Sequence, residues 1–370
     1  MSNRGVLLNQ DDLNMIALGA PVLGTGGGGD PYIGHLIARQ AIAQSGGVRM
    51  ISTAELPNDA LVIGSAMMGA PTVAIEKVPG GEEALLAFRT LEEFVGDEAY
   101  ATFSIEAGGL NSMIPIATAA KRRIPLIDAD CMGRAFPELQ MVSPTLEGIA
   151  ATPLAVADEK GNVVLLKSTD TNRTAERFAR SVTIGMGGSV AIALYRMRGS
   201  QARSALIAGS ISTAFRIGRA LRDAWTTRAN ALQAVLSATS GFLAFQGKIS
   251  DLNRRTEGGF ARGTVAIRGT RPYSGQTLEI EFQNENLIAT RDGRPLVSVP
   301  DLITVLDGET ATPITTERLR YGLRVSVIAM PCDPRWRTKK GLGIVGPECF
   351  GYSNPYRPVE QLLRSTRGTG

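Results

Sequence analysis

Two aspartates stand at the end of a very apolar segment in "LIDADCMGRAFPELQM", residues 126–141. Side chains alternate along a strand, so Asp128 and Asp130 are expected to point to the same side. Two neighbouring carboxylates either bind a cation or separate their pKa values, leaving one as an acid and one as a base. Arg134 and Glu138 follow, and Arg134 either holds a substrate oxygen or pairs with an aspartate. The purely structural alternative is a capped loop held by Arg–Asp pairing.

A second segment, "SIEAGGLNSMIP" at residues 104–115, repeats this order of features. An apolar strand is followed by Glu106, by a glycine pair and then by a helix that begins near Asn111. Gly108 and Gly109 let backbone N–H groups approach a ligand, and a helix N-terminus favours an anion or an oxyanion. The alternative is a simple turn between a strand and a helix.

Two further glycine loops complete the pattern. Four consecutive glycines in "GTGGGGDP", residues 24–31, lose much backbone entropy on folding. We expect this loop to form one wall of a pocket by close backbone approach; the alternative is a tight crossing of two helices that tolerates no Cβ. The loop of "SAMMGAPTVAIEK", residues 65–77, contains Gly69 and Pro71. Met67 and Met68 in the same segment either line a pocket with their thioether groups or pack in the core.

These strand ends and loops predict one small-molecule pocket. The predicted catalytic residues are Asp128, Asp130, Glu106 and Arg134. The predicted substrate-binding residues are Gly26, Gly27, Gly28, Gly29, Asp30, Gly69, Gly108, Gly109, Asn111 and Glu138. Asp128 and Asp130, with Cys131 as a further donor, are the predicted ligands of a divalent metal ion, for which zinc is the first candidate.

Several other site types are not expected. Gly24, Gly26 and Gly29 match G-x-G-x-x-G, but a dinucleotide site needs a strand before the glycines, and the preceding residues 11–23 have helical spacing. NAD and FAD are therefore not expected as cofactors, and PLP is not expected either. His35 is the single histidine, which excludes a zinc site with several histidines from one chain. It lies one turn into the next helix, near the glycine loop, where it is either an exposed residue or a participant.

Composition limits the partners and the compartment. The 370 residues carry a formal charge of +4 and 5% aromatic residues, without a basic block interleaved with aromatics, so nucleic-acid binding is not expected. No apolar run is long enough to cross a membrane, and the N-terminus lacks the apolar core of a signal peptide. Three widely spaced cysteines, Cys131, Cys332 and Cys349, indicate a reducing, cytoplasmic environment. The apolar content leaves room for a homo-oligomer.

The elements that must position these residues change in character along the chain. Residues 1–168 alternate strands and helices, which predicts a three-layer α/β domain with a largely parallel sheet. Residues 169–370 form a second predicted domain, helical over 169–240 and β-rich over 241–355. The β-rich part is expected to be a small all-β barrel or sandwich.

The motifs in this order resemble the S-methyl-thiohydantoin desulfurase family. The resemblance is carried by GTGGGGDP, MGAPTV, EAGGLNS and DADCMGRAFPELQM, and in the tail by RRTEGGFARGTV, VPDLITVLD, YGLRVSVIAMP and VGPECFGY. It extends from about residue 9 to residue 355 and implies an N-terminal α/β domain followed by a β-containing domain. It also implies hydrolysis of an S-methyl-thiohydantoin, a cyclic imide derivative, with release of methanethiol.

The resemblance maps the family motifs onto Gly26 to Asp30, Glu106, Asn111, Asp128, Asp130, Arg134 and Glu138. A glycine is expected where Cys131 stands. The leading interpretation is a hydrolase of a hydantoin-like ring; the alternatives are a non-catalytic subunit or small-molecule-binding partner of a hydantoinase-type enzyme, and a phosphate site on the amides of residues 26–30. If Asp128 and Asp130 instead pair with Arg134 and cap backbone amides, the interpretation as a non-catalytic binding partner is favoured.

Overall fold

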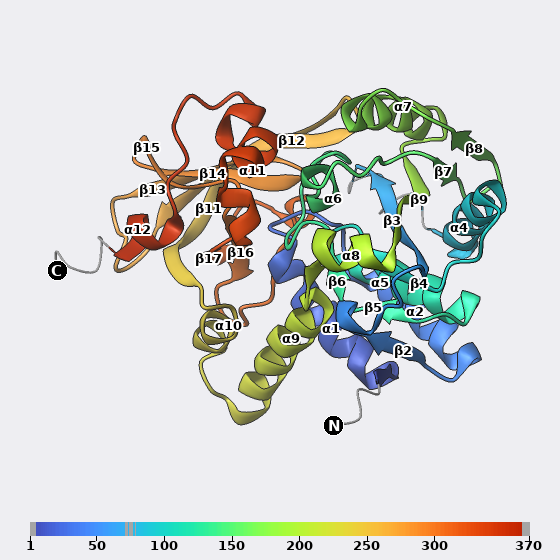
Figure 1. Ribbon diagram of the computed structural model, residues 1–370. Helices are drawn as coiled ribbons and strands as arrows, with labels where there is room; N and C mark the ends of the chain where they lie inside the picture. Colours follow the sequence, from blue (N-terminus) through green and yellow to red (C-terminus); the bar gives the residue numbers. More distant parts are fainter. Residues whose placement is uncertain (1–4, 71–72, 74–76, 78, 365–370) are drawn as a thin grey trace.

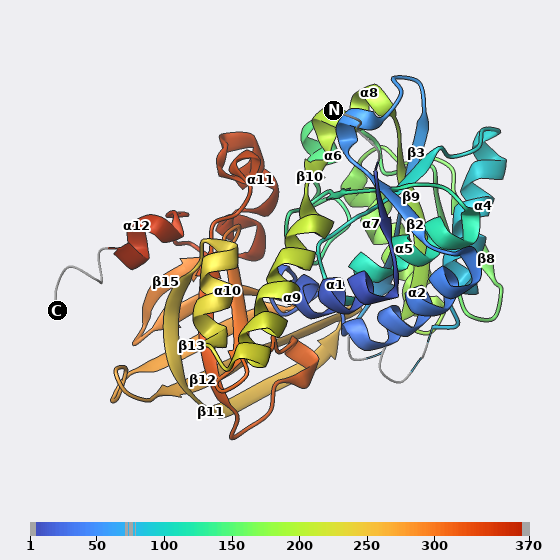
Figure 2. The same ribbon diagram turned by 90° about the horizontal axis from the view of Figure 1, so that it is seen from below.

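The computed structural model describes residues 5–70, 73, 77 and 79–364. Two large β-sheets organise these residues, the first built within residues 6–198 and the second within residues 242–330, and helices connect them (Figure 1). Seen from below, the second sheet lies to one side of the first, and helix α9 (Ser210–Thr227) lies between them (Figure 2). Within the described ranges, no helix has the length and apolar character that crossing a membrane requires.

The first sheet has eight strands and is mixed. In chain order they are β1 (Val6–Leu8), β2 (Val48–Ile51), β3 (Leu61–Gly69), β4 (Ala101–Ser104), β5 (Leu126–Ile127), β7 (Leu154–Ala157), β8 (Val163–Leu166) and β9 (Ser189–Arg198). Their spatial order is β1-β2-β5-β4-β3-β9-β7-β8. The pairings among β2, β5, β4 and β3 are parallel, and the pairings outside this group are antiparallel.

Helices cover both faces of this sheet. They include α1 (Gln10–Leu23), α2 (Pro31–Ser45), α4 (Glu82–Val95), α5 (Gly109–Arg122) and α7 (Asn172–Gly185). Ile63 of β3 packs with Phe88 of α4 on one face. Its neighbour Val62 points the other way and joins the larger core, which also contains Ala179 of α7. The alternation along β3 therefore separates the two helical layers.

Three features of the first sheet differ from the prediction. The segment 169–240 was expected to be helical, yet it contains β9, which pairs with β3 and β7. The small and apolar residues of β9 give no clear period, and tertiary pairing decides their conformation. The sheet is consequently mixed rather than largely parallel. The strand expected to carry both aspartates also breaks at Asp128, and β6 (Ala129–Asp130) pairs instead with β10 (Ile207–Ala208).

Helices α8 (Gly199–Ala205), α9 (Ser210–Thr227) and α10 (Ala231–Thr239) lead to the second sheet. Helix α9 crosses α1 at two glycines. A Cβ on Gly19 would lie 1.9 Å from the carbonyl oxygen of Ala214, and a Cβ on Gly218 would lie 1.9 Å from that of Met15. The tight helix crossing considered for the four-glycine loop therefore occurs here, at isolated glycines inside helices.

The second sheet is antiparallel throughout and forms a half-barrel. Its strands are β11 (Phe242–Glu257), β12 (Phe260–Gly269), β13 (Thr277–Gln283), β14 (Glu285–Arg291), β15 (Arg294–Ser298), β16 (Leu302–Asp307) and β17 (Arg324–Met330). Their order is β15-β14-β13-β12-β11-β17-β16. Shorter helices α6 (Ser143–Leu146), α11 (Lys339–Val345) and α12 (Val359–Arg364) lie outside the two sheets. The predicted fold class, an α/β half followed by a β-rich half, is confirmed.

Candidate functional site

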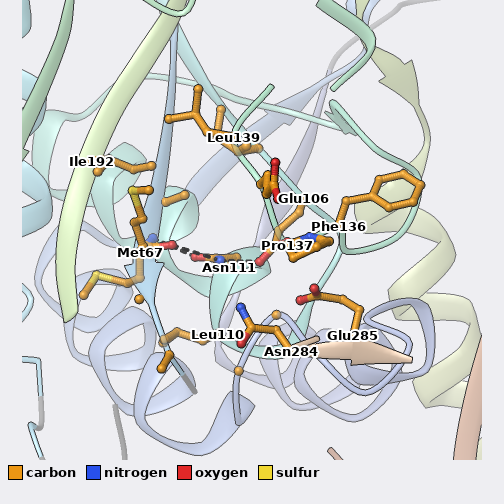
Figure 3. Close-up of a pocket in the computed structure, with 18 of the residues that line it drawn as sticks. Met67, Glu106, Leu110, Asn111, Phe136, Pro137, Leu139, Ile192, Asn284 and Glu285 are labelled. Carbon is orange, nitrogen blue, oxygen red and sulfur yellow. Dashed lines mark hydrogen bonds between the residues drawn. The ribbon is translucent and has the colours of Figure 1, made fainter. Parts of the chain in front are cut away.

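A small cavity lies where the ends of β3 and β4 meet the turn between β13 and β14 (Figure 3). Its volume is about 90 Å³. Apolar side chains form much of its wall, and among the residues that the structure describes five charged side chains line it. The apolar and neutral lining includes Met67, Met68, Ile105, Leu110, Asn111, Phe136, Leu139, Ile192 and Asn284, and the charged lining is Glu106, Glu138, Glu176, Arg180 and Glu285. The cavity therefore suits a small molecule with both apolar and hydrogen-bonding groups.

Glu106 is the acid at the end of β4, and it is 7% exposed. Its Oε1 accepts a 2.5 Å hydrogen bond from Nδ2 of Asn111, in the first turn of α5. Asn111 is itself held by β3, because its Oδ1 accepts from the amide of Met67 at 2.7 Å and its Nδ2 lies 3.2 Å from the Met67 carbonyl oxygen. Burial raises the pKa of Glu106 to about 7, against the opposing effect of the Asn111 hydrogen bond.

The two glycine motifs pack directly on each other. A Cβ on Gly28 would lie 2.5 Å from Cα of Gly108, and a Cβ on Gly109 would lie 2.2 Å from the carbonyl oxygen of Gly29. Gly28 also has φ +69°, a left-handed conformation that glycine adopts at low cost. No side chain fits between these segments, which explains the requirement for bare backbone.

The carbonyl groups of the glycine loop cap helix α5. The amide of Leu110 donates to the carbonyl of Gly28 at 2.9 Å, and the amide of Gly108 donates to Oγ of Ser112 at 3.3 Å. The amide of Gly27 donates to the carbonyl of Gly24. Of the amides expected to approach an anion or oxyanion, those of Gly27 and Gly108 thus have protein acceptors. Gly28 and Gly29 form part of the cavity wall.

Two residues of the cavity come from the second sheet. Asn284 is the single residue between β13 and β14, and it has φ +58°. Its Oδ1 accepts from the amide of Ala261 at 2.8 Å, and its amide nitrogen points toward the cavity in Figure 3. Glu285 follows and is 2% exposed. Burial and the nearby Glu106 charge raise the pKa of Glu285 well above its usual value.

Of the remaining charged residues of the cavity, Glu176 and Arg180 of α7 form an ion pair. Nε of Arg180 donates to Oε1 of Glu176 at 2.8 Å, and its guanidinium lies 4.2 Å from the ring centre of Phe260. Glu176 also accepts from the amide of Leu139. Glu138 accepts a 2.5 Å hydrogen bond from Gln140. Arg180 is therefore already neutralised, and the cavity carries more acidic than basic side chains.

Arg134 does not line the cavity; it is buried beside it and connects the two halves. All five of its N–H groups have acceptors, namely the carbonyls of Ala135, Pro300, Asp301 and Asn286 and the hydroxyl of Thr25. Its guanidinium also lies 4.5 Å from the ring centre of Phe136. Burial lowers the pKa of Arg134 to about 10, so it stays charged near neutral pH. With every donor used, this geometry favours a structural role.

The two aspartates that began the sequence argument also lie outside the cavity lining. Asp128 accepts hydrogen bonds from the amide and hydroxyl of Ser212 at 3.0 and 2.5 Å, and so caps α9. Asp130 is fully buried and accepts from the amides of Met132 and Gly133. Burial raises the pKa of Asp130 to about 7.

The predicted metal site requires further ligands beside this pair, because zinc takes three or four protein ligands. Within the described ranges, no cluster of three or more His, Cys, Asp or Glu side chains is arranged to hold a metal ion. Cys131 is buried, and burial raises the pKa of its thiol well above the usual value. The donor set at Asp128 and Asp130 therefore does not fit zinc, and the reaction steps proposed for this protein do not use a metal ion.

The other predicted residues lie near the cavity or behind it. Asp30 caps α2 through the amide of Tyr32 and pairs with Arg318, and with His35 it lines a separate cleft on the outer side of the glycine loop. Gly69 lines the cavity, whereas Pro71 lies outside the described residues. Of the predicted residues, the cavity brings together Gly28, Gly29, Gly69, Glu106, Asn111 and Glu138. Gly26, Gly27, Gly108 and Gly109 support it without lining it.

Sequence reasoning missed the contributions of α7 and of the second sheet. Glu176 and Arg180 lie four residues apart on a helix that was treated only as a helix. Asn284 and Glu285 lie in "FQNEN", inside the region 241–355 that was predicted only as β-rich. The polar Asn-Glu-Asn interruption of an alternating pattern was the available signal for a turn.

Comparisons with known proteins identify the family to which the chain belongs. Residues 11–168 match the model of the S-Me-THD-like N-terminal domain, and residues 170–359 match that of the S-Me-THD-like C-terminal domain. A crystal structure of a protein from Chromobacterium violaceum is similar, with 27% sequence identity and a TM-score of 0.78 over 96% of this chain and 100% of that one. A search of curated proteins gives no match. The chain belongs to the S-Me-THD-like family, which confirms the resemblance to S-methyl-thiohydantoin desulfurases.

Proposed function

We propose that this S-Me-THD-like protein is a hydrolase of a hydantoin-like cyclic imide, and that its reaction is the desulfurisation of an S-methyl-thiohydantoin with release of methanethiol. One observation carries the proposal: Glu106 lines a small cavity, and burial raises its pKa to about 7. A general base works best when its pKa lies near the working pH. Family membership supports the ring as the substrate class.

The lining of the cavity is compatible with such a ring. Met67, Leu110 and Ile192 supply an apolar wall for the methylthio group. The side-chain Nδ2 group of Asn284, which points toward the cavity, supplies a hydrogen-bond donor for a ring carbonyl oxygen. The excess of acidic side chains favours a neutral ring over an anionic one.

Glu106 is positioned to activate water. As a carboxylate it would take a proton from a water molecule that attacks the ring carbon bearing the sulfur. Asn111 keeps the carboxyl group in place, because the same amide is hydrogen-bonded to the backbone of Met67. Methanethiol is a good leaving group, so the attack on carbon is the step that most needs a base.

One observation favours the alternative, a non-catalytic binding partner of a hydantoinase-type enzyme. Asp128, Asp130 and Arg134, predicted to react, instead have hydrogen-bond partners within the protein. A binding protein would use the same cavity without turnover. The two functions differ in whether Glu106 changes a rate or only an affinity.

The test is methanethiol release from S-methyl-thiohydantoin, measured by gas chromatography of the headspace, with hydantoin binding measured by calorimetry. Glu106→Gln should lower kcat by about 10²–10⁴-fold, the usual contribution of a general base. Glu93→Gln, at an exposed position of α4, is the matched control and should match the wild type. A folded wild-type protein that binds rings without turnover would refute the hydrolase and support the binding partner.

A further inference from the structure

The turn between β13 and β14 brings a second acid to the cavity. In an extended strand, neighbouring side chains point to opposite faces. Asn284 instead adopts φ +58°, which asparagine tolerates better than most residues, and Gln283 pairs with Glu285 across this one-residue turn. As a result, the adjacent side chains of Asn284 and Glu285 both line the cavity (Figure 3).

This turn is fixed to the glycine loop by backbone hydrogen bonds. The amide of Asn286 donates to the carbonyl of Thr25 at 2.7 Å. The amide of Thr316, from a neighbouring segment of the second half, donates to the carbonyl of Gly26 at 2.8 Å. Residues 25 and 26 thus accept backbone hydrogen bonds from two segments of the second half. These backbone contacts, rather than flexible side chains, set the position of Glu285 relative to the first sheet.

The Glu285 carboxyl group occupies the space that the glycine loop leaves free. A Cβ on Gly27 would lie 2.0 Å from Oε1 of Glu285 and 2.5 Å from its Cδ. The other oxygen, Oε2, is buried and has no hydrogen-bond partner among the described residues. A buried carboxyl oxygen without a partner is costly, and it is expected where a ligand supplies the partner.

We propose that Glu285 is a catalytic residue of this site, the acid that protonates the ring nitrogen next to the reacting carbon while Glu106 accepts the proton of the attacking water. The assignment rests on the proposed hydrolase function. It makes the reaction depend on one carboxyl group from each half of the chain.

The proton transfers balance over one turnover. As the bond between the water oxygen and the ring carbon forms, Glu106 takes a proton from water and Glu285 gives its proton to the ring nitrogen. The carbon–sulfur bond then breaks, and Glu106 returns its proton to the departing sulfur, which leaves as methanethiol. The new hydroxyl group becomes a carbonyl group as its proton passes to Glu285. Both carboxyl groups regain their starting states, and no oxidant or reductant is needed.

The electrostatics of the cavity agree with this division of roles. Burial, followed by the charge of Glu106, raises the pKa of Glu285, whereas the charge of Arg134 opposes the shift. Glu138, Glu176 and Arg180 also face the cavity, and the latter two neutralise each other. Two coupled carboxyl groups seldom ionise together, so one remains protonated as an acid while the other serves as a base.

The test compares Glu285→Gln, Glu285→Asp and the wild type in headspace assays of methanethiol release from S-methyl-thiohydantoin between pH 5 and pH 10. Glu285→Gln keeps the size of the side chain but removes its transferable proton. We expect kcat to fall about 10²-fold, within the usual range for a general acid, with KM changed less than about threefold. The loss of activity at alkaline pH should disappear in Glu285→Gln and persist, at a lower rate, in Glu285→Asp. Glu279→Gln, exposed on the same hairpin, should behave as the wild type.

The outcomes separate this assignment from the proposed function. A Glu285→Gln or Glu285→Asp variant that folds and keeps wild-type kcat, or a Glu285→Gln variant that keeps the alkaline limb, overturns the role of Glu285. If Glu106→Gln is inactive at the same time, the hydrolase function stands. A folded wild type that releases no methanethiol from the ring overturns both. If Glu285→Gln does not fold, the rate and alkaline limb of Glu285→Asp decide the question.

Discussion

A single methyl group added at Gly27 tests whether Glu285 lies where the structure places it. The Cβ of Gly27→Ala would lie 2.0, 2.5 and 2.6 Å from Oε1, Cδ and Cγ of Glu285. Unstrained contacts between such atoms lie near 3.5–4.0 Å, so the Glu285 side chain must move by about 1 Å or more. Gly27 does not have a positive φ, so the backbone itself accepts alanine. The three closest contacts therefore all belong to one side chain.

The expected size of the effect follows from that contact. Overpacking of a buried site typically costs about 1–3 kcal/mol of unfolding free energy. In a Glu285→Ala background the opposing atoms are gone, and the substitution at Gly27 should become neutral or stabilise by up to about 1 kcal/mol through the unfolded chain. The double variant should thus be about 1–3 kcal/mol more stable than the sum of the two single effects predicts. Gly28→Ala is the contrasting control, because its Cβ would meet the backbone of Gly108, which Glu285→Ala does not relieve.

The assay is urea unfolding followed by tryptophan fluorescence for the wild type, both single variants and the double variant. Trp336 is fully buried and reports loss of the core. Additive effects of Gly27→Ala and Glu285→Ala would refute the contact. If Glu285→Ala also restores the stability lost in Gly28→Ala, the side-chain contact at Gly27 does not differ from the backbone contact at Gly28, and the reasoning is refuted.

Three further predictions address neighbouring groups. Burial raises the pKa of Asp130 from 3.8 to about 7, so between these pH values the folded state holds a proton that the unfolded state has lost. The free energy of unfolding should therefore fall as pH rises through this range, by up to about 1.4 kcal/mol per pH unit. Asp130→Asn should flatten that slope, as measured by urea unfolding at pH 5 and pH 8. Arg134→Met should leave several buried carbonyl groups unpaired and cost about 3 kcal/mol or more by thermal melting, and Arg134→Lys, with three donors in place of five, should not restore the loss. Asn111→Leu removes the hydrogen bond that lowers the pKa of Glu106, so the acid limb of kcat/KM against pH should move to higher pH.

The part of the site that the sequence could predict is the part that depends on local rules. Residues at the carboxyl ends of neighbouring parallel strands meet at one edge of a sheet, and this rule correctly grouped Glu106, Asn111 and Gly69. The same rule failed for Asp128 and Asp130, because the strand breaks at Asp128 and each side chain caps a different segment. Alternation predicts a shared side only while the strand remains extended.

The remainder of the site depends on contacts between distant parts of the chain. Glu285 and Gly27 are separated by most of the sequence, and no local pattern states that one fills the space left by the other. Strand β9 shows the same limit in the fold, because its central residues, Ala-Ile-Ala-Leu, suit a helix as well as a strand until β3 and β7 are present to pair with it. Sequence reasoning accordingly found the β-rich half but not its contribution to the cavity.

The position of the four-glycine loop accounts for both its composition and its place in the site. Gly28 packs on Gly108 and Gly29 on Leu110, in the first half, while Gly26 and Gly27 pack on Asn286 and Glu285, in the second half. A side chain on either surface would separate the two halves by at least its own thickness. Since Glu106 and Glu285 come from opposite halves, such a separation would also change the distance between the two carboxyl groups. Bare backbone in this loop is therefore a condition for the halves to share one cavity, which explains why glycine occupies four consecutive positions.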